Sequence, residues 1–345
     1  MIKKGGNFSL NSLKKKLWGN NFSHVYVEKN AYSHEIAHRI LSFLKKSTIV
    51  EVDDYKSFFS RPNQIFNVQK NSQKLILAVK KDNLLYEGAK VCQSFDNENF
   101  YYTTSVINCV FDCEYCYLQG VYPSANVVVF VNIEDIFDEL DKMLKNQSIY
   151  LCISYDTDLL GIDFLTNFVN KWYAFSEKHS NLKIELRTKS SNINFFLDKI
   201  LNKNFILAWT LSPENFILSY EHKTASLKKR LDSIRKMQDL NYTVRICFDP
   251  IMYIDNFYKE YEKLIQETFS NIDKDKILDV SIGTFRISKD YLKKMRKNRA
   301  DSPLVYYPYE CIDGVYSYEN KLQREIIAFI KDELEKYMQR EKIFL

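Results

Sequence analysis

Three cysteines lie within eight residues of one another in the first half of the chain. Cys109, Cys113 and Cys116 form the spacing CxxxCxxC in the text CVFDCEYC. A loop of this length can place three thiolates around one face of a cubane iron–sulfur cluster, which leaves one iron without a protein ligand. A small molecule could bind that iron directly, whereas electron-transfer clusters use four cysteines. The spacing therefore predicts a [4Fe-4S] cluster with an open iron.

The alternative interpretation is a zinc site completed by a remote ligand. Zinc sites usually show paired CxxC motifs, or CxxC together with histidines. The chain has five histidines, and none is close to the three cysteines in sequence. The total of seven cysteines is odd, and the N-terminus lacks the apolar run of a secretory signal. We therefore expect a cytoplasmic protein without a disulfide framework.

The elements that must position this loop alternate between β-rich and helical runs. Repeated βα units with short connections predict an α/β fold with a parallel sheet, either open or curved into a partial barrel. Functional groups should then lie at the carboxyl ends of the strands. Strands are expected at residues 100–108, 149–155, 182–188, 205–211, 242–248 and 277–285, and helices at 133–145, 165–179, 193–201, 226–240 and 256–269.

The two ends of the chain do not share this alternation. Residues 1–85 are expected to form a separate α/β portion, residues 86–290 the barrel, and residues 291–345 a basic and aromatic extension with a hairpin and a helix at 322–340. Hydrophobic residues make up 46% and charged residues 27%, which is typical of a globular protein. No run approaches the roughly 18 apolar residues of a membrane span. We expect no membrane association.

The cysteine motif, the aromatic residue after it and the repeated βα units resemble the radical S-adenosylmethionine (SAM) superfamily. The resemblance implies a partial (βα)6 barrel in which SAM chelates the open iron through its amino and carboxylate groups. It also implies that the reduced cluster cleaves SAM to methionine and a 5′-deoxyadenosyl radical, which takes hydrogen from the substrate. A cellular electron donor such as flavodoxin or ferredoxin is then an expected partner.

The text around the cysteines is similar to that of the spore photoproduct lyase family, in its clostridial-type branch. The resemblance implies a DNA-repair lyase that reverts 5-thyminyl-5,6-dihydrothymine, the spore photoproduct, to two thymines. The radical takes hydrogen from C6 of the dihydrothymine ring, the methylene bridge breaks, and a protein group returns hydrogen. The matches follow in order at Cys113–Gln119, Val128–Leu140, Asp158–Thr166, Leu186–Lys189, Ser212, Glu221–Thr224, Arg230 and Asp249–Ile251.

The resemblance assigns roles beside the cluster position by position. Cys109, Cys113 and Cys116 match the cluster ligands. Tyr115 and Tyr117 match two tyrosines that are implicated in relaying hydrogen. We therefore expect both tyrosines to lie close to the reacting groups.

Four further positions match the SAM contacts of the family: Thr157, Asp158, Lys189 and Ser212. A lysine can pair with the SAM carboxylate, and hydroxyl groups at strand ends can fix the ribose. Taken singly, polar residues at strand ends often only cap the following helix. Their joint order along the chain is what favours a SAM site.

Tyr155 departs from the family pattern, in which a cysteine at this position returns hydrogen to the product. Cys92, just upstream of the first expected strand, is the best substitute. An S–H bond gives up hydrogen readily to a carbon radical, whereas a phenol is slower and leaves a stable radical. The alternative is that Cys92 is a small buried residue. Cys152 and Cys247 fall within apolar strands and are expected in the core, and Cys311 has no assigned role.

DNA binding is suggested by basic runs and by a tyrosine-rich segment. Residues 14–16, 228–230 and 289–299 could neutralise phosphates, although a solvated helix face is the commoner explanation of such runs. Residues 304–318 could form a hairpin that places Tyr316 or Tyr318 at the duplex, where an aromatic wedge would help to flip a damaged base. The same tyrosines could equally pack the hairpin itself.

Three classes of function fit these observations. The first is a lyase for thymine lesions in DNA. The second is a related radical SAM enzyme that acts on another substrate, which the departure at Tyr155 motivates. The third is a cluster-bearing nucleic-acid-binding or sensor protein, which would leave the matches at the SAM site without a use.

Overall fold

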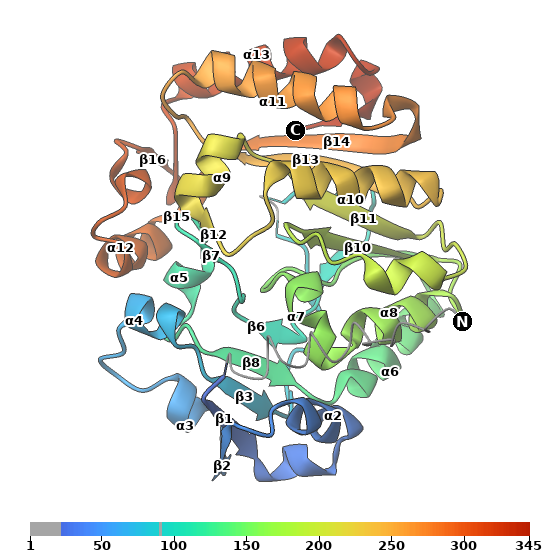
Figure 1. Cartoon of the computed structure of the whole chain (residues 1–345), viewed down its shortest axis with the longest axis vertical. Coiled ribbons are helices and arrows are strands. Elements are labelled where there is room, and N and C mark those ends of the chain that lie inside the picture. Colours follow the sequence, from blue (N-terminus) through green and yellow to red (C-terminus); the bar gives the residue numbers. More distant parts are fainter. Residues whose placement is uncertain (1–21, 90–91) are drawn as a thin grey trace, which may run out of the picture.

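A computed structural model describes residues 22–89 and 92–345 of the chain. Its larger sheet has the strand order β18-β14-β13-β11-β10-β9-β5-β4 and curls into a half-barrel (Figure 1). The pairs from β5 to β18 are parallel, and β4 with β5 is antiparallel. The expected parallel sheet is confirmed. Its strands are β4 (Tyr86–Glu87), β5 (Phe100–Tyr102), β9 (Ile149–Cys152), β10 (Leu182–Thr188), β11 (Phe205–Thr210), β13 (Val244–Ile251), β14 (Ile277–Thr284) and β18 (Ile343–Phe344).

Helices cover the outer face of the half-barrel, as a parallel sheet requires. In β11 all the side chains are buried, since helices cover one face and the barrel interior receives the other. Ser226 caps the start of helix α10, because its hydroxyl accepts a hydrogen bond from the Lys229 N–H. The covering helices are α6 (Ile133–Leu144), α7 (Leu159–Thr166), α8 (Phe168–Ser176), α10 (Leu227–Asp239), α11 (Phe257–Asn271) and α13 (Asn320–Glu335).

Two of the expected helices differ in the structure. Asn167 divides the helix expected at 165–179, because its left-handed backbone (φ 58°) cannot continue a right-handed helix. The run expected at 193–201 forms only one 3-10 segment, Asn194–Asp198. Asparagines are frequent in this connection, and their side chains favour turns over helix interiors.

A second sheet joins N-terminal strands to strands from the centre of the chain. Its order is β2-β1-β3-β8-β6, with β1 (His24–Glu28), β2 (Thr48–Val52), β3 (Leu75–Ala78), β6 (Val106–Ile107) and β8 (Val127–Phe130). The single strand expected at 100–108 is therefore wrong: β5 belongs to the half-barrel and β6 to this sheet. Between them, the Thr103 hydroxyl donates to the Leu84 carbonyl (2.8 Å) and the Thr104 hydroxyl donates to Asp156. The domain boundary at residue 85 remains a prediction.

Short elements complete both ends of the described chain. The N-terminal part contains α2 (Glu35–Phe43), α3 (Lys56–Phe59) and α4 (Phe66–Asn71). The C-terminal part contains α12 (Lys289–Asn298) and the sheet β15-β17-β16. This sheet is built from β15 (Arg286–Ser288), β16 (Glu310–Ile312) and β17 (Val315–Ser317), so the expected hairpin is confirmed. Over the described residues, no helix has the length and apolar character needed to cross a membrane.

Candidate active site

A cavity of about 1040 Å³ opens into the half-barrel, and most of the predicted site residues line it. Ser212 is the exception among them, because its side chain is buried outside the cavity wall. The cavity therefore gathers residues from strands that are far apart in the sequence. The predicted residues that line it are Cys92, Cys109, Cys113, Tyr115, Cys116, Tyr117, Thr157, Asp158 and Lys189.

The three cysteines of the motif all face this cavity from one loop. Within 22–89 and 92–345, no three His, Cys, Asp or Glu side chains converge as ligands of one metal ion. The N–H groups of Phe111 and Asp158 each lie 3.4 Å from the Cys109 sulfur, and such N–H···S contacts are typical of cluster thiolates. Burial raises the pKa of the Cys109 thiol to about 11, while nearby Lys70 opposes that rise. These residues fit a cluster held by three thiolates.

The N-terminal part of the chain holds this loop from one side. The Lys70 ammonium, on α4, donates to the carbonyl groups of Cys109 (2.7 Å) and Phe111 (2.6 Å). The Gln73 amide donates to the Cys109 carbonyl (3.1 Å) and to Ala125 (2.6 Å). Bonds from a buried cation to backbone carbonyls are among the stronger hydrogen bonds of a protein. Sequence reasoning missed both residues, because lysine and glutamine are common on helices and carry no local signal.

The C-terminal extension holds the same loop from another side. The Arg299 guanidinium donates to the Gln119 side-chain oxygen (2.8 Å) and to the Asp112 carboxylate. The Gln119 amide in turn donates to the Cys113 carbonyl (2.9 Å). Arg299 was expected in a phosphate-binding run, but it is buried and ion-paired, so that part of the expectation is wrong.

A buried carboxylate organises the third side of the loop. Glu221, on β12 (Glu221–His222), pairs with Cys113 on β7 (Asp112–Cys113). Its carboxylate accepts hydrogen bonds from the Tyr115 hydroxyl, from Ser212 (3.0 Å) and from Arg230 (2.5 Å). Arg230 holds the pKa of Glu221 below its usual value, despite a larger opposing effect of burial.

This network bears on three expectations. The hydroxyl groups of Ser212 and Tyr115 both donate to Glu221 and so support the cluster loop, while their roles in binding SAM and relaying hydrogen stay predictions. Arg230 was expected among the phosphate-binding residues, but it is completely buried, and that expectation is wrong. Lys228 and Lys229 of the same run remain exposed, and residues 14–16 lie outside the described residues.

The residues expected to contact SAM after β9 and β10 divide into two kinds. The Asp158 carboxylate caps α7 through the Gly161 N–H (3.0 Å) and also accepts from Thr188 (2.8 Å) and from the Lys189 N–H (2.6 Å). The Thr157 hydroxyl is buried and has no hydrogen-bond partner among the described residues. The Lys189 ammonium lies 5.5 Å from the centre of the Tyr115 ring. Thr157 and Lys189 are therefore the groups that remain available to a ligand.

Cys92 and Tyr155 meet in the cavity wall. The Cys92 sulfur lies 3.7 Å from the Tyr155 hydroxyl, within hydrogen-bonding distance for sulfur. The Tyr155 ring stacks on Tyr102 with its centre 4.0 Å away, and the Tyr117 hydroxyl donates to the Tyr155 carbonyl (2.7 Å). Burial and the neighbouring thiol raise the pKa of Tyr155, so its phenol stays protonated. A thiol and a phenol therefore face the same space.

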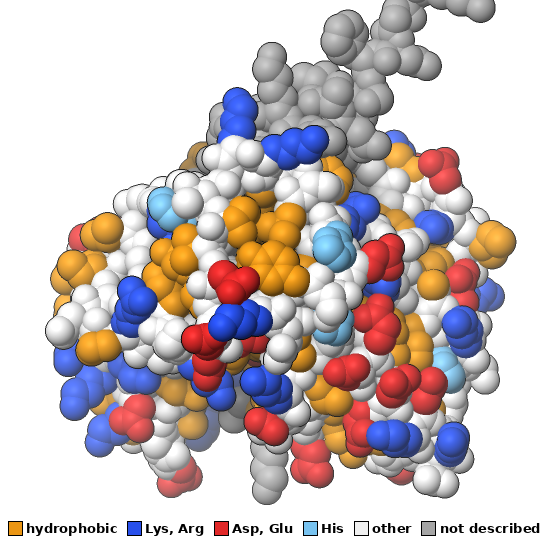
Figure 2. Space-filling model, turned by 90° about the horizontal axis from the view of Figure 1, so that it is seen from below, with side chains coloured by type: hydrophobic (Ala, Val, Ile, Leu, Met, Phe, Trp, Pro, Cys, Tyr) orange, Lys and Arg blue, Asp and Glu red, His pale blue; other side chains and the backbone are white. Residues whose placement is uncertain are grey.

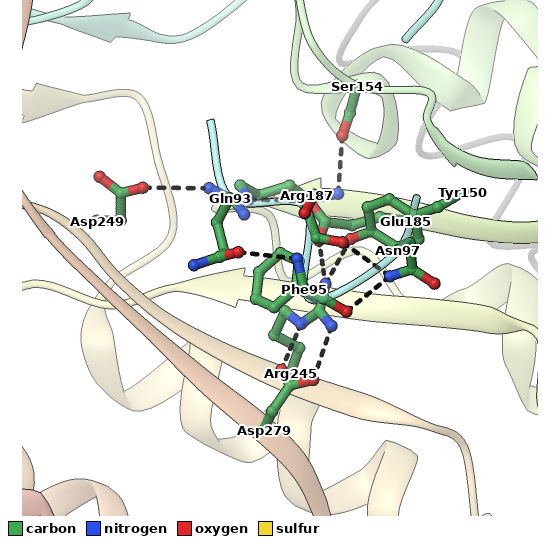
Figure 3. A network of polar contacts seen from close by, with 11 residues as sticks. Gln93, Phe95, Asn97, Tyr150, Ser154, Glu185, Arg187, Arg245, Asp249 and Asp279 are labelled. Carbon is green, nitrogen blue, oxygen red and sulfur yellow. Dashed lines mark hydrogen bonds and ion pairs between the residues drawn. The ribbon is translucent and has the colours of Figure 1, made fainter. Parts of the chain in front are cut away.

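Charged side chains fill the barrel interior beneath the cavity (Figure 3). Arg245, on β13, pairs with Glu185 of β10 (2.6 Å) and with Asp279 of β14. Its guanidinium lies 3.1 Å from the centre of the Phe95 ring. The arginines hold the pKa of Glu185 down to about 2, against a larger opposing effect of burial. Sequence reasoning missed this network, although charged residues within three apolar strand runs were a signal that could have revealed it.

Of the remaining predictions, the core cysteines are confirmed and one wedge candidate is wrong. Cys152 and Cys247 are buried, and Cys311 is exposed. Tyr318 is only 2% exposed, and its hydroxyl accepts a hydrogen bond from the Tyr253 N–H (2.8 Å), so it cannot enter a duplex. Tyr316, on β17, is half-buried.

Comparison with known proteins matches most of the chain. The family model for spore photoproduct lyase matches residues 21–343. The spore photoproduct lyase of Clostridium acetobutylicum is 22% identical over 298 residues, covering 81% of this chain and 82% of that protein. That of a Geobacillus species is 25% identical over 237 residues, covering 63% and 68%.

Solved structures give the same result for the fold. A mutant spore photoproduct lyase with bound AdoMet and dinucleoside spore photoproduct superimposes with a TM-score of 0.79 at 19% sequence identity. The superposition covers 94% of this chain and 98% of that one. The half-barrel thus has the fold of that structure. From the family model and the relatives together, the chain belongs to the spore photoproduct lyase family of radical SAM enzymes.

Proposed function

We propose that this protein reverts the spore photoproduct in DNA to two thymines, and that Cys92 returns the hydrogen atom to the product. The observation that supports the donor role is the position of the Cys92 sulfur, which lines the cavity 3.7 Å from the Tyr155 hydroxyl. Tyr155 takes the place of the family's donor cysteine. A thiol from another segment thus reaches the same part of the cavity.

The residues of the cavity divide the work of binding between them. Cys109, Cys113 and Cys116 would hold the [4Fe-4S] cluster. The Lys189 ammonium would pair with the SAM carboxylate, and the Thr157 hydroxyl would gain its missing partner in the bound ligand. When bound, cluster and SAM supply the 5′-deoxyadenosyl radical that takes hydrogen from the lesion.

Hydrogen return is the step that the chain's own residues perform. After the methylene bridge breaks, the S–H bond of Cys92 breaks homolytically and a C–H bond forms at the thymine radical, which leaves a sulfur radical on Cys92. The Tyr155 hydroxyl orients the thiol through their contact. The Tyr117 hydroxyl donates to the Tyr155 carbonyl (2.7 Å) and so fixes the position of that residue.

A lesion-turnover assay tests this proposal. Reduced enzyme is incubated with SAM and the dinucleotide lesion, and the products are separated. Wild-type protein should release thymine. Cys92→Ala should give by-products in place of much of the thymine, and adding Tyr155→Cys should restore thymine, because it returns a thiol to the family's usual position.

Cys311→Ala, at an exposed cysteine outside the cavity, is the matched control and should behave as wild type. Clean thymine release by Cys92→Ala would remove Cys92 as the donor. SAM cleavage without lesion reversal by the wild-type protein would favour a different substrate.

The proposed electron donor is a flavodoxin or a ferredoxin. This partner, together with a DNA substrate, fits the expected cytoplasmic location.

A further inference from the structure

Helix α4 carries exposed apolar side chains although it lies against the cluster loop. Ile65, at the start of the helix, is 65% exposed, and Val68 is 63% exposed. The two are three positions apart and so lie on one side of the helix. The opposite side carries Lys70, which binds the Cys109 carbonyl (2.7 Å). Helix α4 therefore contacts the cluster loop through Lys70 and exposes Ile65 and Val68 on its other side.

Exposed basic residues lie on the segment that leads into α4. Between residues 55 and 80 the chain has no acidic residue; Lys56 and Arg61 are exposed there, whereas Lys70 and Lys80 are buried. Lys223 is another exposed cation. It lies beside α4, because its ammonium donates to the Lys70 carbonyl (3.0 Å) at the end of that helix. The nearby acidic residues Asp112 and Glu114 are paired with Arg299 and His222. Figure 2 shows acidic side chains most densely on the right and fewer on the left, the side on which α3 and α4 lie in Figure 1.

We propose that the surface formed by Ile65, Val68 and Lys223 is the docking site of an acidic one-electron carrier protein that reduces the cluster. The inference rests on the proposed function, because it requires the cluster. One electron leaves the carrier's reduced cofactor and enters the oxidised cluster, and no bond or proton changes place. The Lys70 contact with Cys109 joins the docking surface to the cluster loop.

The apolar centre favours a protein partner over DNA. DNA interfaces are polar and strongly basic, whereas the core of a protein interface is apolar and poor in charge. Exposed aliphatic side chains within a basic rim suit a carrier whose cofactor edge is apolar and whose surface is acidic. Such complementary charge speeds the encounter of the two proteins.

The test is reduction of the cluster in holoenzyme with the double substitution Ile65→Glu and Val68→Glu. Loss of visible absorbance is followed after mixing with reduced flavodoxin, and separately with dithionite, which is too small to need a docking surface. Reduction by flavodoxin should slow by about tenfold or more, as expected for loss of an interface centre. Reduction by dithionite should not change, and calorimetry should show weaker flavodoxin binding.

Ile200→Glu is the matched control, since Ile200 is 83% exposed and follows the 3-10 segment Asn194–Asp198, outside the cluster loop. An unchanged rate with flavodoxin would overturn the proposal. Unchanged cluster reduction together with slower repair of a lesion-containing duplex would assign this surface to DNA and overturn the proposal as well.

If the double variant slows cluster reduction by both flavodoxin and dithionite, the variant Lys223→Glu decides. A rate of reduction by flavodoxin equal to that of wild type would then overturn the proposal. Cluster reduction needs no lesion, so failure of the wild type to repair would refute the proposed function alone.

Discussion

At the scale of single residues, the thiol that faces the cavity comes from a different segment than in the family pattern. Tyr155 stands at the end of a barrel strand, where the family pattern has a cysteine, and its ring is fixed by stacking on Tyr102. The thiol comes instead from the segment before β5. The Cys92 sulfur lies 3.7 Å from the Tyr155 hydroxyl, so the thiol and the phenol face the same part of the cavity. Under the proposed mechanism a thiol remains the donor, and the change at Tyr155 alters which part of the backbone positions it.

Asp163, on α7, should make stability depend on pH. Burial raises the pKa of Asp163 from 3.8 to about 6. The folded state therefore binds a proton more tightly than the unfolded state, so stability falls as pH rises from about 4 to about 6. The full loss corresponds to about 3 kcal/mol above that range.

Asp163→Asn removes the charge and keeps an acceptor for the Val169 N–H (2.8 Å). Urea unfolding should show the variant more stable than wild type at about pH 8, with a gap that shrinks towards about pH 4. A gap that does not change with pH would contradict the assignment.

The sequence predicts which residues lie at the site more readily than what each side chain does there. The resemblance placed the cluster cysteines, Thr157 and Lys189 in one region, and all of them line the cavity. It could not show that Asp158 and Ser212 are occupied by protein partners. A carboxylate or hydroxyl that caps a helix has the same identity as one that binds a ligand, and only its neighbours in space tell the two apart.

At the scale of elements, the cluster loop is supported mainly by segments outside the strand that leads to it. Lys70 of α4 is the clearest case, because its buried ammonium bonds two loop carbonyls. Lys70→Met should leave both carbonyls without this partner and destabilise the loop by about 3 kcal/mol. Iron content and visible absorbance after purification should therefore fall.

Lys74→Met is the matched control, since the Lys74 ammonium donates to the hydroxyl groups of Ser23 (2.5 Å) and Ser72 (3.2 Å) near the surface. It should keep its iron. Equal iron loss in both variants would show that the Lys70 contacts do not stabilise the site.

The elements show the same limit of sequence reasoning. Alternating periodicity located the strands and most helices of the half-barrel. It could not show that one β-rich run, 100–108, serves two sheets, because the chain changes sheet at Thr103 and Thr104 through bonds to Leu84 and Asp156. Those partners are close only after folding.

At the scale of the whole molecule, exposed lysines of α12 stand beside the cavity mouth, which Ser288 and Tyr291 line. Substituting Lys293, Lys294 and Lys297 by glutamine should weaken binding of a lesion-containing duplex. If all three contact phosphates, the slope of log affinity against log salt should fall by about 2.7. Turnover of the dinucleotide lesion should not change. Binding measured over a range of salt concentrations checks this prediction.

Substituting Lys228 and Lys229, which are exposed on α10 over the outer face of the barrel, is the control and should leave the slope unchanged. A slope that is unaltered by the α12 substitutions would mean that DNA lies elsewhere.

The bond between Gln119 and Arg299 joins residues that are 180 positions apart. A ribosome needs on the order of tens of seconds to make that length of chain. Throughout this interval the three cysteines are already synthesised, but the arginine that completes their support is still missing. Cluster insertion should therefore follow release of the finished chain. A nascent chain that stops before Arg299 should fail to retain iron even when the assembly machinery is abundant.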